Sequence, residues 1–443
     1  MRPACLSPRH ARLPSHTAWQ QSRTLLTLAI ETSCDDTSVA ILEKDSARSQ
    51  LHFHRKITSD NRVYQGVHPL VAVESHQRNL AKLVGLALQS LPTLPATKAH
   101  DGTALLIRGS HGAEFRKKPD FVTVTRGPGM RSSLATGLDT AKGLSVAWQV
   151  PMLGVNHMQA HALTPRLVST LDATRSVAAA PAPAFPFLTF LVSGGHTMLV
   201  HSKALCDHEI LAETIDMAIG DVIDKCARDI LPTDVLSGSS TVMYGRLLEA
   251  FAFPDGEVDY AYTAPTSRAD EIEVKKTEYQ WAIGPPLSQS RAMEFSFSAL
   301  GSTIQRITRS NPDMPTSERR VLARETMRVS FEHLISRLFL ALQDRELHAI
   351  ETCVVSGGVA SNRYLKHMLR AALEARGFED LAVVFPPPAL CTDNAAMIAW
   401  TGVEMWEAGF RTDLEALALK KWAIDPRAQD GGILGAEGWH RRD

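Results

Sequence analysis

The chain has 443 residues, which is longer than one typical domain, so two domains are expected. Hydrophobic residues make up 44% of the chain and charged residues 21%, and the formal net charge is −1. This composition is that of an ordinary globular protein. It excludes an overall basic charge, but it leaves a local basic groove for nucleic acid as one possibility. Six scattered cysteines without a Cys-x-x-Cys pair argue against a disulfide framework. The sequence has no run of about 18 apolar residues, so no membrane span and no membrane partner are predicted.

The N-terminus has the composition of a mitochondrial transit peptide. Residues 1–26 contain four arginines and several Ser and Thr, and no acidic residue precedes Glu31. A continuous apolar core, as in a secretory signal peptide, is missing. A disordered basic tail is the alternative interpretation. Without the leader the chain would carry 43 basic residues (47 − 4) against 48 acidic ones, a mildly acidic balance.

Two apolar runs then flank an acidic turn. Residues 25–31 and 37–42 are predicted strands, and alternation predicts a third at 51–58. Between the first two, Thr32-Ser-Cys-Asp-Asp36 would place Asp35 and Asp36 at the tip of a hairpin. Actin-like phosphotransferases present a carboxylate to a metal-bound phosphate in this way. Asp is also a common turn former, so the local sequence leaves both interpretations open.

Further along, a strand leads into a glycine turn and a helix. Residues 66–92 predict an amphipathic helix, and the polar stretch 93–119 predicts a surface loop. The strand at 120–125 ends in Arg126-Gly-Pro-Gly129, ahead of a helix that reaches Trp148. A glycine turn at a helix N-terminus lets backbone N–H groups approach an anion, and a simple tight turn is the alternative.

The next strand, residues 151–155, leads directly into a helix with two histidines. His157 and His161 are four residues apart, so both imidazoles project from the same helix face. This spacing offers two ligands to a divalent metal. Two ordinary helix histidines are the alternative, because a lone His-x-x-x-His motif is weak evidence.

The strand order of residues 25–58 then recurs. A strand at 187–192, a turn at Ser193–Thr197, a strand at 198–201 and another near 210–214 predict an internal duplication. We therefore expect two related α/β lobes that face each other across a cleft. The segments 172–186, 232–241 and 253–293 are predicted insertions.

The last third again combines strands, glycines and helices. A strand at 352–356 precedes Gly357 and Gly358, and Asp393 stands where another helix begins. Together with the turns at 127–129 and 194–195, these glycines favour a nucleotide held by backbone amides. Asp393 would complete a set of two imidazoles and one carboxylate that suits iron or zinc, or it would merely cap the helix.

Eight motifs stand along the chain in this order: Glu31-Thr-Ser-Cys-Asp-Asp36, Gly127-Pro-Gly129, His157-x-x-x-His161, Ser193-Gly-Gly-His-Thr197, Asp224-Lys-x-Ala-Arg228, Phe295-Ser-Phe-Ser298, Gly357-Gly-Val-x-x-Asn362 and Cys391-Thr-Asp-Asn-Ala-Ala-Met-Ile398. Over about residues 26–425 they resemble the motifs of the tRNA threonylcarbamoyladenosine transferase family. This is the TsaD-type group, once labelled O-sialoglycoprotein endopeptidases. With its leader, the chain resembles the mitochondrial form.

The resemblance implies an actin-like ATPase (ASKHA) fold, with two duplicated lobes of mixed sheets flanked by helices around a central cleft. It implies transfer of the threonylcarbamoyl group from L-threonylcarbamoyl-AMP to N6 of the adenosine 3′ of the anticodon. The substrates would be mitochondrial tRNAs that read ANN codons, and AMP would be released. An upstream threonylcarbamoyl-AMP synthase would supply the donor, and a homodimer in the mitochondrial matrix is expected.

Site residues follow from the motifs. His157, His161 and Asp393 match the family's ligands for one divalent metal ion per subunit, iron or zinc. Asp35, with Asp36 beside it, matches the acidic catalytic position. The substrate and nucleotide contacts match Ser193, Gly194, Gly195, His196, Thr197, Asp224, Gly245, Glu249, Gly357, Gly358 and Asn362. Of these, the turn at 193–197 meets the phosphate and acyl group, Asp224, Gly245 and Glu249 meet the ribose, and Asn362 meets the adenine region.

The expected domains are a transit peptide (1–26), an N-terminal lobe (27–155), a C-terminal lobe with the insertions (156–390), a helix that returns the metal ligand (391–425) and a tail (426–443). The chain departs from the family's pattern at three places, one of which is the segment 253–293, without a counterpart in the shorter bacterial members. The Pro-Gly-Gly-Pro after the Asp-Lys helix is missing, which leaves the alignment of Gly245 and Glu249 open. Leu70 replaces the acid after Pro69.

Three other functions are compatible with parts of this pattern. An actin-like kinase or ATPase would need neither the two histidines nor tRNA. A non-catalytic nucleotide-binding scaffold would not need to keep Asp35, both histidines (157 and 161) or Asp393. A zinc protease would carry a glutamate general base directly after His157, where this chain has Met158.

Overall fold

The computed structural model describes residues 24–442, except 47, 65, 100, 101, 110, 111, 173–179 and 239–242. Most of the predicted transit peptide, residues 1–23, therefore lies outside the described residues. Parts of the predicted insertions at 172–186 and 232–241 lie outside them as well.

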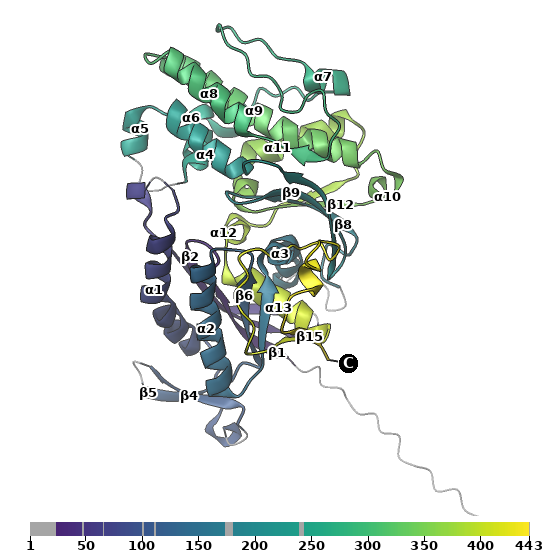
Figure 1. The fold of residues 1–443 in the computed structure, drawn as a ribbon. Helices are drawn as coiled ribbons and strands as arrows, with labels where there is room; N and C mark the ends of the chain where they lie inside the picture. Colours follow the sequence, from purple (N-terminus) through teal and green to yellow (C-terminus); the bar gives the residue numbers. More distant parts are fainter. Residues whose placement is uncertain are drawn as a thin grey trace, which may run out of the picture.

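A seven-stranded mixed sheet forms the first lobe (Figure 1). Strands β1 and β2 pair antiparallel, as do β2 and β3, whereas β1, β6 and β7 run parallel. The central strands β1 and β6 are buried almost throughout, as expected for strands covered on both faces. The strands are β1 (Leu25–Glu31), β2 (Asp36–Lys44), β3 (Ser49–Thr58), β6 (Phe121–Gly127), β7 (Met152–Asn156), β14 (Phe410–Thr412) and β15 (Trp439–Arg441), in the order β15-β14-β7-β6-β1-β2-β3.

The second sheet repeats this arrangement. Its order is β11-β10-β9-β8-β12-β13; β8, β9 and β10 pair antiparallel, and β8, β12 and β13 run parallel. The five strands β10-β9-β8-β12-β13 thus match β3-β2-β1-β6-β7 in order and direction, which confirms the predicted duplicated, actin-like α/β fold. The strands are β8 (Phe187–Val192), β9 (Thr197–Ala204), β10 (Asp207–Thr214), β11 (Glu294–Phe295), β12 (Thr352–Ser356) and β13 (Ala382–Val384).

Four helices cover the first sheet. Helices α1 (Pro69–Gln89) and α2 (Arg131–Trp148) pack on its outer face, and α3 (His157–Leu171) and α13 (Ala395–Glu407) pack on the other (Figure 1). Helix α3 also contacts β8 and β12 of the second sheet. One apolar core therefore runs from the first sheet through α3 and α13 to Phe187 of the second sheet.

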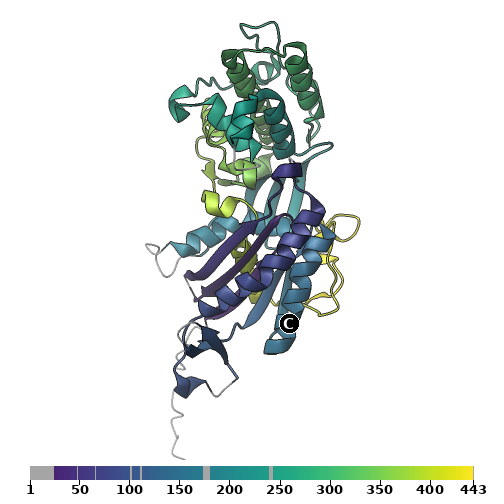
Figure 2. The ribbon, with the colours of Figure 1, turned by 90° about the vertical axis from the view of Figure 1, so that its left-hand side faces the viewer.

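Helices of the second lobe pack on the face of its sheet that lies away from α3 (Figures 1 and 2). They are α4 (Ile219–Ile230), α6 (Tyr244–Ala252), α8 (Ser298–Ser310), α9 (Thr316–Ala341) and α11 (Arg363–Ala375). The shorter helices are α5 (Thr233–Ser237), α7 (Arg268–Ile272), α10 (Arg345–His348) and α12 (Pro388–Cys391), with 3-10 turns η1 (Arg62–Tyr64), η2 (Ala96–Lys98), η3 (Gly256–Asp259), η4 (Gly358–Ser361) and η5 (Gly432–Leu434). Among the described residues, none of the helices has the length and apolar character needed to span a bilayer.

The structure differs from the sequence prediction in two segments. The expected loop at 93–119 contains a hairpin of β4 (Ala104–Gly109) and β5 (Gly112–Lys117). The expected tail at 426–443 contains η5 and β15, and β15 pairs with β14 at the edge of the first sheet. Strands of three residues are too short to show a periodicity, and most residues of β4 and β5 are not buried, so neither pair has a clear apolar alternation.

We predict that Gly402→Ala destabilises the protein by roughly 1–3 kcal/mol, because overpacking at a tight contact has this cost. A Cβ at Gly402 in α13 would lie 2.4 Å from Cγ2 of Thr123 in β6. Gly143→Ala is the matched control: this exposed glycine of α2 has open space around it, so the substitution is expected to stabilise by about 0.4–1 kcal/mol. Urea unfolding of both variants tests the packing, and equal effects at the two positions would contradict it.

Candidate active site

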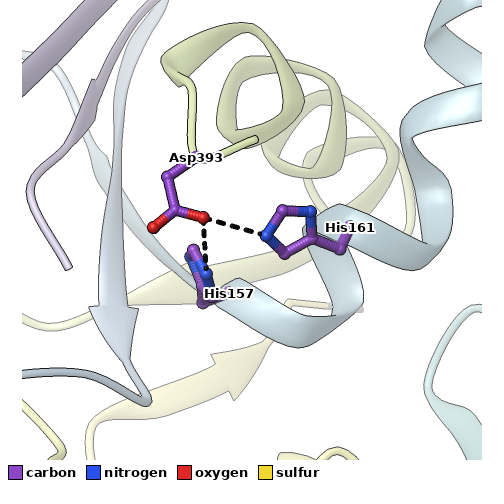
Figure 3. A group of neighbouring side chains, drawn as sticks. All are labelled: His157, His161 and Asp393. Carbon is purple, nitrogen blue, oxygen red and sulfur yellow. Dashed lines mark hydrogen bonds and ion pairs between the residues drawn. The ribbon is translucent and has the colours of Figure 1, made fainter. Parts of the chain in front are cut away.

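Two imidazoles from α3 converge on one carboxylate oxygen of Asp393, which stands in the loop before α13 (Figure 3). Oδ1 of Asp393 lies 3.1 Å from Nε2 of His161 and 3.4 Å from Nε2 of His157. The imidazoles are buried, and the potential ligand atoms of all three residues lie within 4.8 Å of one another. Two imidazoles and a carboxylate are a donor set that suits zinc or iron, so the residues present fit the divalent ion that the sequence predicted.

Helix caps fix the positions of these ligands. Asn156, at the end of β7, caps α3 by accepting hydrogen bonds from the backbone N–H groups of Met158 and Gln159. Asn394 likewise caps α13, so the cap is the neighbour of Asp393 rather than Asp393 itself. The interpretation of Asp393 as a capping acid is therefore wrong, and its carboxylate faces the histidines instead.

Glu31, which the sequence prediction gave no role, orients His157. Its carboxylate is fully buried at the end of β1 and accepts hydrogen bonds from Ser33 N and Thr125 Oγ1. Nδ1 of His157 lies 3.2 Å from Oε2 of Glu31. An ionised carboxylate can only accept, so Nδ1 of His157 carries a proton, and Nε2 is the atom that would give its lone pair to a bound metal ion. A charged residue at the end of an otherwise apolar strand was the available signal for this role.

The charges around His157 act strongly on the pKa values of the group. Burial lowers the pKa of His157, but the negative charges of Asp393 and Glu31 outweigh burial and raise it to about 10. Burial raises the pKa of Asp393, but the two imidazoles hold it well below its usual value. The carboxylates of Glu31 and Asp393 therefore favour a positive charge between them, where His157 lies.

The structure separates the roles of the two acids at the first hairpin. Both carboxylate oxygens of Asp36 are occupied: Thr58 Oγ1 donates to Oδ1 at 2.5 Å and Lys56 Nζ to Oδ2 at 2.8 Å. Lys56 also donates to Thr392 Oγ1 at 2.7 Å, which ties the hairpin to the loop that carries Asp393.

Asp35, in contrast, is partly exposed and accepts a 3.3 Å hydrogen bond from Nδ2 of Asn61 at Oδ2. Burial, Asp36 and Asp393 raise its pKa to about 6. A carboxylate with such a pKa is suited to accept a proton near neutral pH. Of the two acids, Asp35 is the more exposed and so the more accessible to a reacting group, and Asp36 holds the hairpin in place.

The predicted substrate turn at Ser193–Thr197 lies beside the histidines. Burial, followed by the charges of His157 and His161, lowers the pKa of His196 to about 4, so its imidazole is neutral. Oγ of Ser193 accepts from the N–H groups of Gly195 and His196, and Thr197 Oγ1 accepts from Ile219 N at the start of α4. A Cβ at Gly194 or Gly195 would meet no atom within 4 Å, so protein packing does not require these glycines.

The other glycine turns are close packed. A Cβ at Gly357, where φ is +101°, would lie 2.4 Å from the carbonyl oxygen of Val192, so glycine lets β12 end against β8. Gly358 follows in η4, beside Thr392. In the first lobe, a Cβ at Gly127 would meet Leu419 O at 2.2 Å and one at Gly129 would meet Ser33 O at 2.6 Å. Packing therefore explains why glycine stands at 127 and 129, and an anion site at this turn stays a prediction.

The predicted ribose contacts form a second cluster in the second lobe. Oδ1 of Asp224 accepts from Gly245 N at 2.6 Å, and burial raises the pKa of Asp224 to about 6. Oε1 of Glu249 accepts from the N–H groups of Arg363 and Tyr364 at the start of α11. The structure therefore places Asp224 beside Gly245. It places Glu249 beside the two residues that follow Asn362. The sequence alone had left the alignment of Gly245 and Glu249 open.

Asn362 is the N-cap of α11. Its Oδ1 accepts from Leu365 N at 2.9 Å, and the residue is 8% exposed. The capping function accounts for its buried amide, and contact with adenine stays a prediction.

Comparison with known proteins gives consistent matches. The family model described as TsaD, tRNA N6-adenosine threonylcarbamoyltransferase, matches residues 112–400. The chain is 37% identical to the mitochondrial tRNA N6-adenosine threonylcarbamoyltransferase of Schizosaccharomyces pombe, over 94% of this chain and 89% of the relative. It is 30% identical to the tRNA N6-adenosine threonylcarbamoyltransferase of Zymomonas mobilis, over 91% and 93%. Among solved structures, HypF from T. kodakarensis overlaps 86% of this chain and 48% of its own, with 13% identity and a TM-score of 0.40.

We predict that Glu31→Gln weakens zinc binding by roughly 10–100-fold, because the hydrogen-bond partners of ligating histidines have effects of this size. Glu404→Gln is the matched control, since Glu404 of α13 is also a buried carboxylate but pairs with Arg166 of α3 instead of with a histidine. Competition with a chromophoric chelator measures both affinities. Unchanged zinc affinity in a folded Glu31→Gln protein would contradict the role given to Glu31.

Proposed function

Because the chain belongs to the TsaD family of tRNA N6-adenosine threonylcarbamoyltransferases, we propose specific roles for its site residues in that reaction. The family assignment makes the chain an acyltransferase that modifies N6 of an adenosine in tRNA. The observation that carries the proposal is the convergence of His157, His161 and Asp393, beside a partly exposed Asp35.

The proposed donor is L-threonylcarbamoyl-AMP, and the proposed acceptor is the adenosine 3′ of the anticodon in mitochondrial tRNAs that read ANN codons. The N6 amine attacks the carbamoyl carbon, and the bond from that carbon to the phosphate oxygen of the donor breaks. AMP leaves with the bonding electrons, and the amine loses one proton. Such a reaction depends mainly on positioning and on charge neutralisation at the leaving phosphate.

Each site residue has a separate role in this proposed reaction. The carboxylate of Asp35 orients the N6 amine and accepts its proton. The open face at Gly194 and Gly195 lets the donor's phosphate and acyl group approach the backbone. Asp224 and Glu249 accept hydrogen bonds from ribose hydroxyls, near the N-terminus of α11.

A divalent ion is the proposed cofactor. His157, His161 and Asp393 would hold one ion per subunit, zinc or iron, and Glu31 would keep His157 in the ligating tautomer. When bound, this ion supplies positive charge at the donor's phosphate. Met158 follows His157, so the general base of a zinc protease is missing at that position.

We further propose that the protein acts in the mitochondrial matrix as a homodimer, with its donor made by an upstream threonylcarbamoyl-AMP synthase. The acid-free leader supports import into mitochondria, as does the name of the relative from S. pombe. Residues 27–155 and 156–390 are the proposed lobes, with residues 391–425 returning the metal ligand to the first lobe.

The direct test combines residues 27–443, a tRNA that reads ANN codons, L-threonylcarbamoyl-AMP and a series of divalent metals. We expect mass spectrometry of the digested tRNA to detect threonylcarbamoyl-adenosine, with a yield that depends on the metal. Absence of the modified nucleoside with every metal would refute the proposed function.

We predict that Asp35→Ala lowers the transfer rate by roughly 10²–10⁴-fold, the usual contribution of a general base, while zinc and donor still bind. Asp36→Ala is the comparison, because it removes the partner of Lys56 and Thr58 and should lower the unfolding temperature. Single-turnover rates, donor binding and thermal unfolding distinguish the two roles. Loss of donor binding in Asp35→Ala would contradict its assignment as proton acceptor.

A further inference from the structure

Large apolar side chains are exposed along the segment after β3 and in the first turn of α1. Val63 is 88% exposed, Tyr64 53%, Val67 45% and Leu70 75%. Single exposed apolar residues are normal, but four within eight positions indicate a binding surface. We call these four residues the apolar patch.

Hydrogen bonds fix the apolar patch relative to Asp35. Asn61 is fully buried; its Nδ2 donates to Oδ2 of Asp35, and its Oδ1 accepts from His68 N at 3.0 Å. Ser59 N donates to the carbonyl oxygen of Asp35 at 3.0 Å. One buried side chain thus connects the segment that carries the patch to the proposed proton acceptor.

The patch lies where a large substrate would meet both lobes. Figures 1 and 2 both show the start of α1 at the end of the first lobe that faces the helices of the second lobe. A polymer that reaches Asp35 from outside would therefore pass close to this segment.

The chemistry of the patch suits nucleobases rather than phosphates. The rings of Tyr64 and His68 are stacked, with centroids 4.1 Å apart and planes inclined by 26°. The guanidinium of Arg62 is paired with Asp60, and the first turn of α1 contains no acidic residue that would repel RNA. Unpaired bases in RNA loops are commonly bound by stacking on such aromatic side chains.

We propose that Val63, Tyr64, Val67 and Leu70 are the docking surface for the unpaired tRNA bases next to the target adenosine, with the Tyr64–His68 stack as the platform. This inference rests on the proposed function: when N6 of the adenosine reaches Asp35, its neighbours in the anticodon loop must lie close by. The apolar patch binds bases of the anticodon loop. A second protein chain is the alternative occupant, and the test must distinguish it from RNA.

Steady-state kinetics of the tRNA reaction test the platform. Tyr64→Ala should raise KM for tRNA by roughly tenfold, the effect of losing one stacked base, while kcat and the KM for the donor stay within about twofold. Tyr64→Phe keeps the ring and should restore the KM for tRNA to within about threefold of wild type. A structural role of Tyr64 would instead move the unfolding temperature and both KM values.

A matched pair of valines supplies the control. Val63 and Val258 are 88% and 90% exposed, but Val258 lies in η3 of the second lobe. Val63→Ser should raise KM for tRNA severalfold, and Val258→Ser should leave it unchanged. Equal KM values for all variants would overturn the proposal. A change in molar mass by light scattering, without a change in KM, would also overturn it and would identify the patch as a protein interface.

A binding experiment keeps this inference separable from the proposed function. If the wild-type protein forms no modified adenosine, the proposed function is wrong. Fluorescence anisotropy with two RNAs then tests whether the apolar patch binds loop bases. Wild type should bind an anticodon stem-loop more tightly than a hairpin of the same stem with minimal loop, and Tyr64→Ala should lose this preference. Equal preference in both proteins would overturn the proposal.

Discussion

The shared oxygen of Asp393 is the contact on which the rest of the site depends. It lies within 3.4 Å of two buried imidazoles that are more than 230 residues away in sequence. Buried charges are costly unless they are paired or bind a metal. The site therefore requires α3 and α13 to pack closely against each other and against β1, whose last residue, Glu31, orients His157. The buried apolar faces of α13 and the tight contact at Gly402 supply that packing.

Duplication of the fold gives two related turns that have diverged in chemistry. The turn after β1 carries acids, and the turn after β8 carries two glycines and His196. In both lobes a glycine after the strand that runs parallel to the first one (β6 or β12) permits close approach to the end of that first strand or its turn: Gly129 contacts Ser33, and Gly357 contacts Val192. The same backbone geometry thus places the proposed proton acceptor in one lobe and an open glycine turn in the other. This difference suits a reaction that brings an amine and a phosphate-linked acyl group together.

Much of this arrangement could be predicted from sequence, where a signal is local and periodic. The apolar runs of β1 and β8, the spacing of His157 and His161 and the repeated strand order all survive in the structure. Other features depend on tertiary contacts. Glu31 resembles an ordinary strand end until the fold places His157 beside it. The close packing of Gly127 on Leu419 and of Gly129 on Ser33 likewise depends on the fold and has no signal in the local sequence. The edge strands β14 and β15 are too short to predict.

The central claim is that His157, His161 and Asp393 hold a metal ion against the donor's phosphate. A crystal structure of the protein with zinc and L-threonylcarbamoyl-AMP, with anomalous data at the zinc edge, tests it most directly. We predict one anomalous peak per chain, at about 2.0–2.2 Å from Nε2 of both histidines and from an oxygen of Asp393, with a donor phosphate oxygen as a further ligand. A peak elsewhere, or a donor bound away from this ion, would contradict the account.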